Sequence, residues 1–183
     1  KYLPGDRSDL NWSQYRPFSE VPKLMNPQSG FVWNANNDPA FATDGADNMV
    51  HSDFPATMGL QTNMTNRAKR ILELTQDASQ PIDRKRLLAM KFDNSYAKGS
   101  IADGVVLTVL AADFTAEPEL AKAQAHLAKW DYSTGKDSAH AALGVMTTLK
   151  ATTEKYTGDV PPEPAQAFRI AVDYLNQHHS GIT

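Results

Sequence analysis

The sequence predicts a mainly α-helical fold, preceded by a short strand and long loops. Two features of the 183 residues support this prediction. Residues 1–60 are rich in Pro, Asn, Asp and Gly, the residue types that form turns. From Asn63 onward, apolar residues recur with the period of helices. We therefore expect a loop-rich segment over residues 1–60 and a helical region of about six helices over residues 61–183.

The loop-rich segment contains one predicted strand. Residues 30–35 read Gly-Phe-Val-Trp-Asn-Ala, an aromatic and β-branched run between two clusters of turn-forming residues. No second strand is predicted to pair with it, so its backbone groups need neighbours from chain outside this sequence. Residues 40–59 show no period and are expected to form a long loop.

The helical region divides into successive amphipathic or apolar stretches. The second helix is expected to open at Pro81, because proline is favoured in the first turn. Residues 101–112 are nearly all apolar, and their length favours a buried helix over a buried strand. Asp137 is expected to cap the fifth helix. The predicted helices cover residues 67–74, 81–90, 101–112, 120–130, 139–149 and 165–175.

Composition excludes several classes of protein. The 18 Lys and Arg against 21 Asp and Glu give a net charge of −3, which argues against a basic nucleic-acid-binding surface. No apolar run approaches the ~20 residues that span a bilayer. Cysteine is absent, which excludes disulfides, thiolate metal sites and a thiol nucleophile. Neither nucleic acid nor a membrane is therefore an expected partner.

Common catalytic motifs are absent as well. The sequence contains no GxSxG elbow, no Walker loop and no HExxH helix. Its five histidines do not have the spacing of a metal site, and His126 and His140 are expected at the edge of the core. We therefore assign no metal ligand and no cofactor.

Three asparagines lie at the end of the predicted strand, in the run Asn-Ala-Asn-Asn-Asp-Pro over residues 34–39. One interpretation is an asparagine-rich turn, because Asn adopts the left-handed conformation and bonds its own backbone. The other is a carboxamide donor held at a strand end, where it stabilises a developing oxyanion. With neither cysteine nor a nearby histidine base, such a site indicates a nucleophile like an N-terminal Ser, which its own amino group activates.

Motifs along most of the chain resemble those of the penicillin-amidase-like acylases, which are N-terminal-nucleophile hydrolases. The most specific motif is Asn-Pro-Gln-Ser-Gly-Phe-Val-Trp-Asn-Ala-Asn-Asn-Asp-Pro over residues 26–39. Residues 2–22 resemble the motif that opens the family's pattern, and residues 66–74 resemble an arginine-containing helix that follows it. Residues 127–143, with Trp-Asp near their start, resemble a later segment.

This resemblance implies a reaction and roles for individual residues. Family members are precursors that cut themselves into a small α chain and a large β chain, and the β chain begins with the catalytic Ser. That Ser attacks an amide carbonyl, and water then hydrolyses the acyl-enzyme. Asn36 corresponds to the oxyanion-hole asparagine, and Arg70 to an arginine that organises the site. Arg67 is the second choice, because the loop between the motifs varies in length.

The resemblance also implies that this chain is a fragment. It does not begin with Ser, and Lys1-Tyr2 is not a self-cleavage start, so the nucleophile is expected upstream. We expect the helical portion of a β chain from an enzyme that is α+β as a whole. Its partner is the remainder of the precursor, namely the α chain and the N-terminal part of the β chain. Alone, the fragment is expected to be catalytically silent.

Substrate class and location follow from the same family. The expected substrate is a small N-acyl amide, either an acyl-homoserine lactone or a penicillin-type side chain. The form of the asparagine motif favours the acyl-homoserine-lactone and aculeacin type. An exported family implies a periplasmic or secreted location. Some members bind structural calcium near the positions of Asp44 and Asp47, although solvated loop carboxylates are the favoured interpretation here.

Two alternatives stay open. The chain is also compatible with a non-catalytic helical binding or scaffold module, in which Asn36 and Arg70 are ordinary turn and surface residues. It is equally compatible with an inactive acylase relative. The acylase interpretation predicts that Asn36 and Arg70 lie close together at the edge of the domain.

Overall fold

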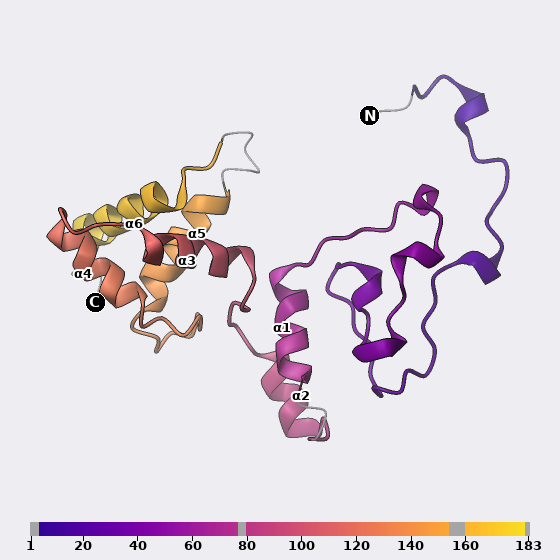
Figure 1. The fold of residues 1–183 in the computed structure, drawn as a ribbon, viewed down its shortest axis with the longest axis horizontal. Helices are drawn as coiled ribbons and strands as arrows, with labels where there is room; N and C mark the ends of the chain where they lie inside the picture. The colour runs from indigo at the N-terminus through magenta and orange to yellow at the C-terminus, as the bar shows by residue number, and fades with distance from the viewer. Residues whose placement is uncertain (1–3, 77–79, 154–159, 182–183) are drawn as a thin grey trace. The chain divides into compact units, whose positions relative to one another are not determined.

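The computed structural model describes residues 4–76, 80–153 and 160–181 (Figure 1). The sequence-based statements about Lys1, Tyr2 and Leu3 lie outside these residues. The chain divides into two compact units, Lys1–Asn63 and Met64–Thr183, and each is described by itself.

The first unit consists of loops and single-turn 3-10 helices. These short helices are Ser8–Leu10 (η1), Phe18–Glu20 (η2), Pro39–Phe41 (η3), Gly45–Asp47 (η4), His51–Asp53 (η5) and Ala56–Met58 (η6). Side-chain bonds connect these turns. The carboxamide of Asn48 accepts hydrogen bonds from the backbone N–H groups of Ala42 and Thr43 at 3.1 and 3.0 Å. Its Nδ2 donates to the Thr43 carbonyl at 2.9 Å.

The predicted strand over residues 30–35 is not formed. The segment bonds to residues 42 and 43 instead of to a neighbouring strand. The Trp33 N–H donates to the Ala42 carbonyl at 2.9 Å, and the Thr43 hydroxyl donates to the Phe31 carbonyl at 2.8 Å. Aromatic and β-branched residues favour a strand, but a strand exists only with a partner. Within the described residues, no ladder of backbone bonds supplies one.

The second unit is helical, which confirms the mainly α fold. Each of the six predicted helices is present. Their bounds are Asn66–Thr75 (α1), Arg84–Lys91 (α2), Ile101–Ala111 (α3), Pro118–Leu127 (α4), Ala141–Thr152 (α5) and Pro164–His178 (α6). Across the described ranges, no helix combines the length and the apolar character needed to cross a bilayer.

The start signals predicted for two of the helices are wrong. α2 does not open at Pro81, because the carboxylate of Asp83 accepts the Arg86 N–H at 2.7 Å and caps the helix there. Asp137 does not cap α5. It lies in an exposed turn in which the Ser138 N–H donates to the carbonyl of Gly135 at 2.9 Å, and α5 begins only after His140.

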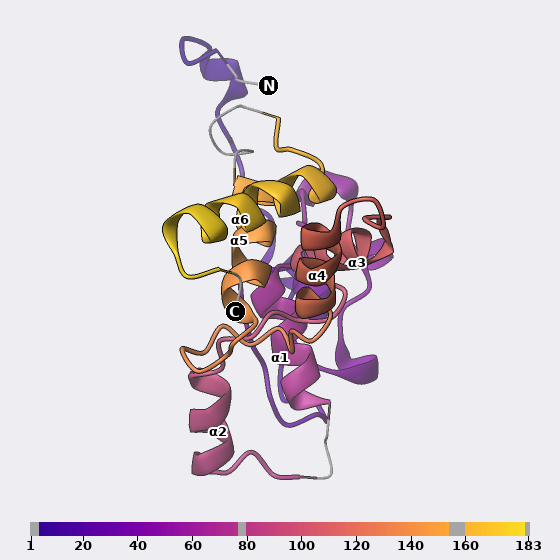
Figure 2. The ribbon, with the colours of Figure 1, turned by 90° about the vertical axis from the view of Figure 1, so that its left-hand side faces the viewer.

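The apolar core lies among α3, α4, α5 and α6. Figure 2 shows α6 lying over α5, with α3 and α4 beside them. The side chains that α4 contributes are Leu120, Ala123 and Leu127, all buried on one face as the spacing predicts. Buried side chains of α6 include Phe168, which packs against Phe114 with ring centroids 5.4 Å apart.

Trp130 closes this core just after the end of α4. Its indole N–H donates to the Ser133 carbonyl at 2.8 Å, and its ring stacks on Tyr132 with centroids 5.0 Å apart. Gly144 of α5 faces the indole ring, and a Cβ at this position would lie 2.2 Å from the Cε3 atom of Trp130. The indole therefore occupies the space that a side chain at residue 144 would need.

α1 and α2 stand at the side of this helical group (Figure 1). α1 is joined to residues 93–98 by polar contacts at three positions along its length. The Asn66 carboxamide accepts the Ala97 N–H at 2.8 Å, and the Glu73 carboxylate accepts the Lys98 N–H at 2.6 Å. Between them, Arg70 bonds to Asp93.

Candidate functional site

Asn36 lies in a turn that its own backbone helps to close. Its φ is +56°, in the left-handed region, which asparagine tolerates better than most residues. The Asn36 N–H donates to Oδ1 of Asn34 at 2.7 Å, and its carbonyl accepts from Nδ2 of Asn63 at 3.1 Å. The residue is exposed. The turn therefore fixes the backbone of Asn36 and leaves the residue at the surface.

The other two asparagines of the motif use their side chains within the turn. Oδ1 of Asn37 accepts the Ala35 N–H at 2.9 Å, and its Nδ2 donates to the carbonyls of Asp38 and Phe41 at 2.8 and 3.0 Å. Asn34 accepts the Asn36 N–H. For Asn34 and Asn37, the interpretation as turn-forming residues is therefore confirmed.

Asp38 and His51 form a pair that sequence reasoning missed. The Asp38 side chain is 6% exposed, and both of its carboxylate oxygens lie within 2.9 Å of Nε2 of His51. Oδ1 of Asp38 also accepts the Ala40 N–H at 2.8 Å, which caps η3. The Asp-Pro pair at residues 38 and 39 is a helix-start signal from which the cap, but not the pairing with His51, could have been predicted. Nothing local indicated the distant His51.

Asp44 and Asp47 both serve the loop. Oδ1 of Asp44 accepts the N–H of Gly45 at 2.8 Å, and the Asp47 carboxylate accepts the N–H of Gln28. In residues 4–76, 80–153 and 160–181, no group of three or more His, Cys, Asp or Glu side chains is arranged to hold a metal ion. Both aspartates therefore accept hydrogen bonds from backbone N–H groups of the first unit.

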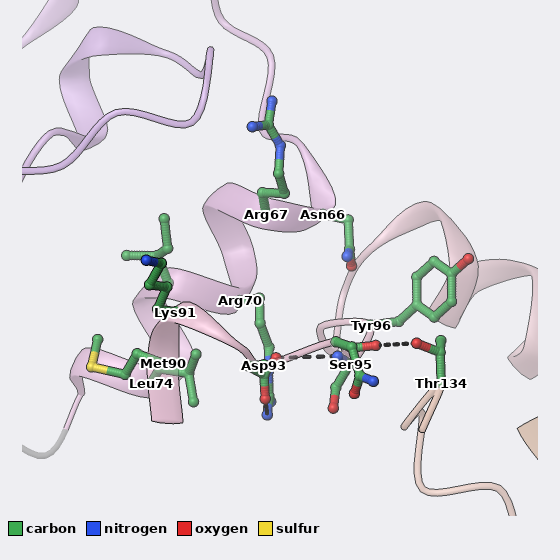
Figure 3. A pocket seen from close by; sticks show the side chains of 12 residues that line it. Asn66, Arg67, Arg70, Leu74, Met90, Lys91, Asp93, Ser95, Tyr96 and Thr134 are labelled. Carbon is green, nitrogen blue, oxygen red and sulfur yellow. Dashed lines mark hydrogen bonds and ion pairs between the residues drawn. The ribbon is translucent and has the colours of Figure 1, made fainter. Parts of the chain in front are cut away.

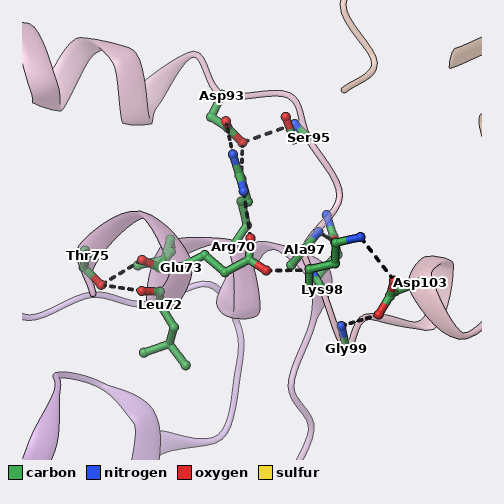
Figure 4. A network of polar contacts seen from close by, with 12 residues as sticks. Arg70, Leu72, Glu73, Thr75, Asp93, Ser95, Ala97, Lys98, Gly99 and Asp103 are labelled. Atoms are coloured by element: carbon green, nitrogen blue, oxygen red, sulfur yellow. Dashed lines mark hydrogen bonds and ion pairs between the residues drawn. The ribbon is translucent and has the colours of Figure 1, made fainter. Parts of the chain in front are cut away.

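Arg70 is at the centre of an ion-pair network in the second unit (Figure 4). Its Nε and Nη2 each donate to one oxygen of Asp93 at 2.8 Å, and its Nη1 donates to Glu73 at 2.7 Å. The hydrogen bonds from Arg70 hold the pKa of Asp93 below its usual range, against the opposing effect of burial. Two carboxylates therefore compensate the charge of Arg70.

A cavity of about 550 Å³ lies between α1 and the chain that follows α2 (Figure 3). Its lining includes Arg67, Arg70, Asp93, Tyr96 and Thr134. Arg67 is exposed, and its side chain points away from that of Arg70 in Figure 3. The two candidate arginines therefore lie in different surroundings on the same helix.

Asn36 belongs to the first unit, whereas Arg67 and Arg70 belong to the second. The expected proximity of Asn36 and Arg70 therefore stays a prediction.

His126 and His140 form a second pair that the sequence did not indicate. The Nε2 of His126 lies 3.0 Å from Nδ1 of His140 and 3.2 Å from the Ala139 carbonyl. Burial lowers the pKa of His126, and the nearby charge of His140 lowers it further. The pair joins the last turn of α4 to the start of α5.

A comparison with protein families agrees with the motifs. The family model described as penicillin amidase matches residues 1–179. This match covers both units and includes the asparagine motif as well as α1. The chain belongs to the penicillin amidase family.

Proposed function

We propose that this chain is part of the β chain of an acylase that hydrolyses the amide bond of an N-acyl substrate. Membership of the penicillin amidase family implies amide hydrolysis. Under this proposal, the attacking nucleophile is an N-terminal Ser outside this sequence. The observation that carries the proposal is the state of Asn36, an exposed residue whose backbone is bonded on both sides.

The chemistry of amide hydrolysis requires such a group. Attack on an amide carbonyl places negative charge on its oxygen, and a neutral N–H donor that is already in position stabilises that charge. Such a donor contributes about 10²–10³ in kcat, or about 2.7–4 kcal/mol. Asn36 supplies this donor in our proposal, because the turn fixes its backbone before the substrate arrives.

One of the two arginines organises the site in this proposal. The charge of Arg70 is compensated by Asp93 and Glu73, so Arg70 organises the site by holding α1 to residues 93–98. Arg67, which is exposed and lies one turn earlier in α1, is the second choice for the arginine that organises the site.

The remaining parts of the proposal follow from the family resemblance. The partner is the remainder of the precursor, and the chain alone is inactive. The substrate is an acyl-homoserine lactone or a penicillin-type amide, and the location is periplasmic or secreted. Synthetic N-acyl amides of each type, offered to the whole enzyme, distinguish the two substrate classes.

The test of the proposal replaces Asn36 in the whole precursor. Asn36→Gly keeps the left-handed backbone accessible but removes the donor, and Asn36→Asp keeps the size but replaces the donor with an acceptor. We expect both to lower kcat by about 10²–10³ per mole of self-cleaved enzyme. The exposed Asn11 provides the control variant, Asn11→Ala, which is expected to retain wild-type kcat.

The alternative is a non-catalytic helical module or an inactive relative. The turn contacts of Asn34 and Asn37 favour it, because two of the three asparagines in the motif use their side chains to form the turn. Unchanged amide hydrolysis in Asn36→Gly would reject the oxyanion role. A whole precursor that cleaves itself but hydrolyses none of the added N-acyl amide substrates would support the interpretation as an inactive relative.

A further inference from the structure

We propose that Asn63 is a positioning residue for the Asn36 carboxamide, and that it acts by clamping the turn from a distant part of the sequence. This inference rests on the proposed function. It adds to that function a residue that touches neither the substrate nor the nucleophile.

Asn63 bonds to the turn at two points. Its Nδ2 donates to the carbonyl of Asn36 at 3.1 Å, across 27 residues of sequence. Its own backbone carbonyl accepts the Asp38 N–H at 2.8 Å. A single residue therefore bonds on both sides of Asn37, and all of these residues lie in the first unit.

The bond to the Asn36 carbonyl completes the fixation of this residue. Oδ1 of Asn34 already holds the Asn36 N–H at 2.7 Å. With Asn63 in place, the peptide groups before and after Asn36 are both held, and together they set the direction of its Cα–Cβ bond. Catalytic groups require positioning within about 0.5 Å and 10–20°. A misplacement of about 1 Å costs up to about 10²-fold in rate.

The side chain of Asn63 is separable from the rest of the turn. The bond from the Asp38 N–H goes to the backbone of Asn63 and does not need its side chain. Asp38 is also anchored independently by His51 and by the Ala40 N–H. We therefore expect Asn63→Ala to retain the turn and to free only the carbonyl of Asn36.

The experiment is a double-mutant cycle in the whole self-cleaved enzyme. We expect Asn63→Ala to lower kcat by about 10–100-fold, with KM within about twofold of wild type. In the Asn36→Gly background, Asn63→Ala should have no further effect, because the group that it positions is gone. Asn63→Gln, which keeps an N–H₂ donor, should recover part of the rate. The matched control, Asn11→Ala, should leave kcat unchanged relative to its parent in both backgrounds.

Several outcomes overturn the inference. Unchanged kcat in Asn63→Ala would show that the bond to Asn36 has no positioning role. An equal loss in the wild-type and Asn36→Gly backgrounds would show that Asn63 acts independently of the Asn36 carboxamide, through general stability. A rise in KM without a change in kcat would assign Asn63 to substrate binding.

A second measurement separates this inference from the proposed function. Hydrogen exchange of the backbone amides over residues 34–41, followed by mass spectrometry, reports on the turn without requiring activity. Faster exchange in Asn63→Ala than in Asn11→Ala supports the clamp even where the wild-type enzyme hydrolyses no amide, a result that would reject the proposed function alone. Equal exchange in both variants rejects the clamp.

Discussion

Replacing Gly144 by Ala tests how tightly α5 packs against Trp130. The added Cβ would lie 2.2 Å from Cε3 of the indole and 2.5 Å from Cδ2 and Cζ3. Ordinary contact begins at 3.4 Å, so the ring or the helix must move by about 1.2 Å. Trp130 cannot withdraw easily, because its N–H is bonded to Ser133 and its face is stacked on Tyr132.

The expected cost follows from two opposing effects. Overpacking of a dense core costs about 1–3 kcal/mol, and a clash with a buried ring belongs at the upper end of this range. Alanine recovers about 1 kcal/mol of helix propensity. We therefore expect Gly144→Ala to lower the free energy of unfolding by about 2 kcal/mol and Tm by roughly 4–8 °C.

Gly104 of α3 provides the matched control. It is also a helical glycine, but a Cβ there would meet no atom within 4 Å. Gly104→Ala should therefore raise the free energy of unfolding by about 0.5–1 kcal/mol. Urea unfolding followed by Trp fluorescence measures both variants. If Gly144→Ala is as stable as wild type, the indole of Trp130 does not fill the space beside residue 144, which would contradict the reasoning.

Two further predictions concern charge. Arg70→Met should lower the free energy of unfolding by about 1.5–3 kcal/mol, because it removes the hydrogen bonds to Asp93. The pKa of Asp93 is lowered in the fold, so this contribution is present above its unfolded pKa of about 3.9 and is lost as pH falls through the folded pKa. Urea midpoints of wild type and Arg70→Met should therefore converge below about pH 4, and a constant gap would contradict the pairing. The pKa of His126 is lowered too, but histidine is charged when protonated, so the unfolded chain binds the proton more tightly. The contribution of neutral His126 to the free energy of unfolding should be fully present above about pH 6.5 and should fall as pH drops towards the folded pKa. Urea midpoints of His126→Gln should vary less between about pH 7 and 5 than those of wild type, and identical profiles would exclude this role for His126.

The sequence predicted the helices well because burial enforces their period. In α4, Leu120, Ala123 and Leu127 are 8%, 0% and 1% exposed, so the apolar spacing indicated the buried face directly. The helix starts were less accurate. Competing caps such as Asp83 differ by small free energies, which local preferences do not resolve.

The strand prediction was wrong because β-propensity does not predict whether a second strand is present to pair with the first. Val32, at the centre of the predicted strand, is 61% exposed and not part of any ladder. Local composition indicated a turn at Asn34 and Asn37 as one of two interpretations, and their side-chain contacts confirm it. The partners that hold this turn, His51 and Asn63, lie 13 and 27 residues away from the groups they bond. No local spacing encodes such contacts.

The polar contacts of α1 have a consequence for its register. Asn66, Arg70 and Glu73 are spaced four and three residues apart, so they lie along one face of the helix. A slide by one residue would shift the helix by about 1.5 Å and turn it by about 100°, which would separate all three from their partners at once. Residues 93–98, which follow α2, therefore allow only one register and one rotation of α1. Because the rotation of α1 is fixed, the direction of the Arg67 side chain is fixed as well.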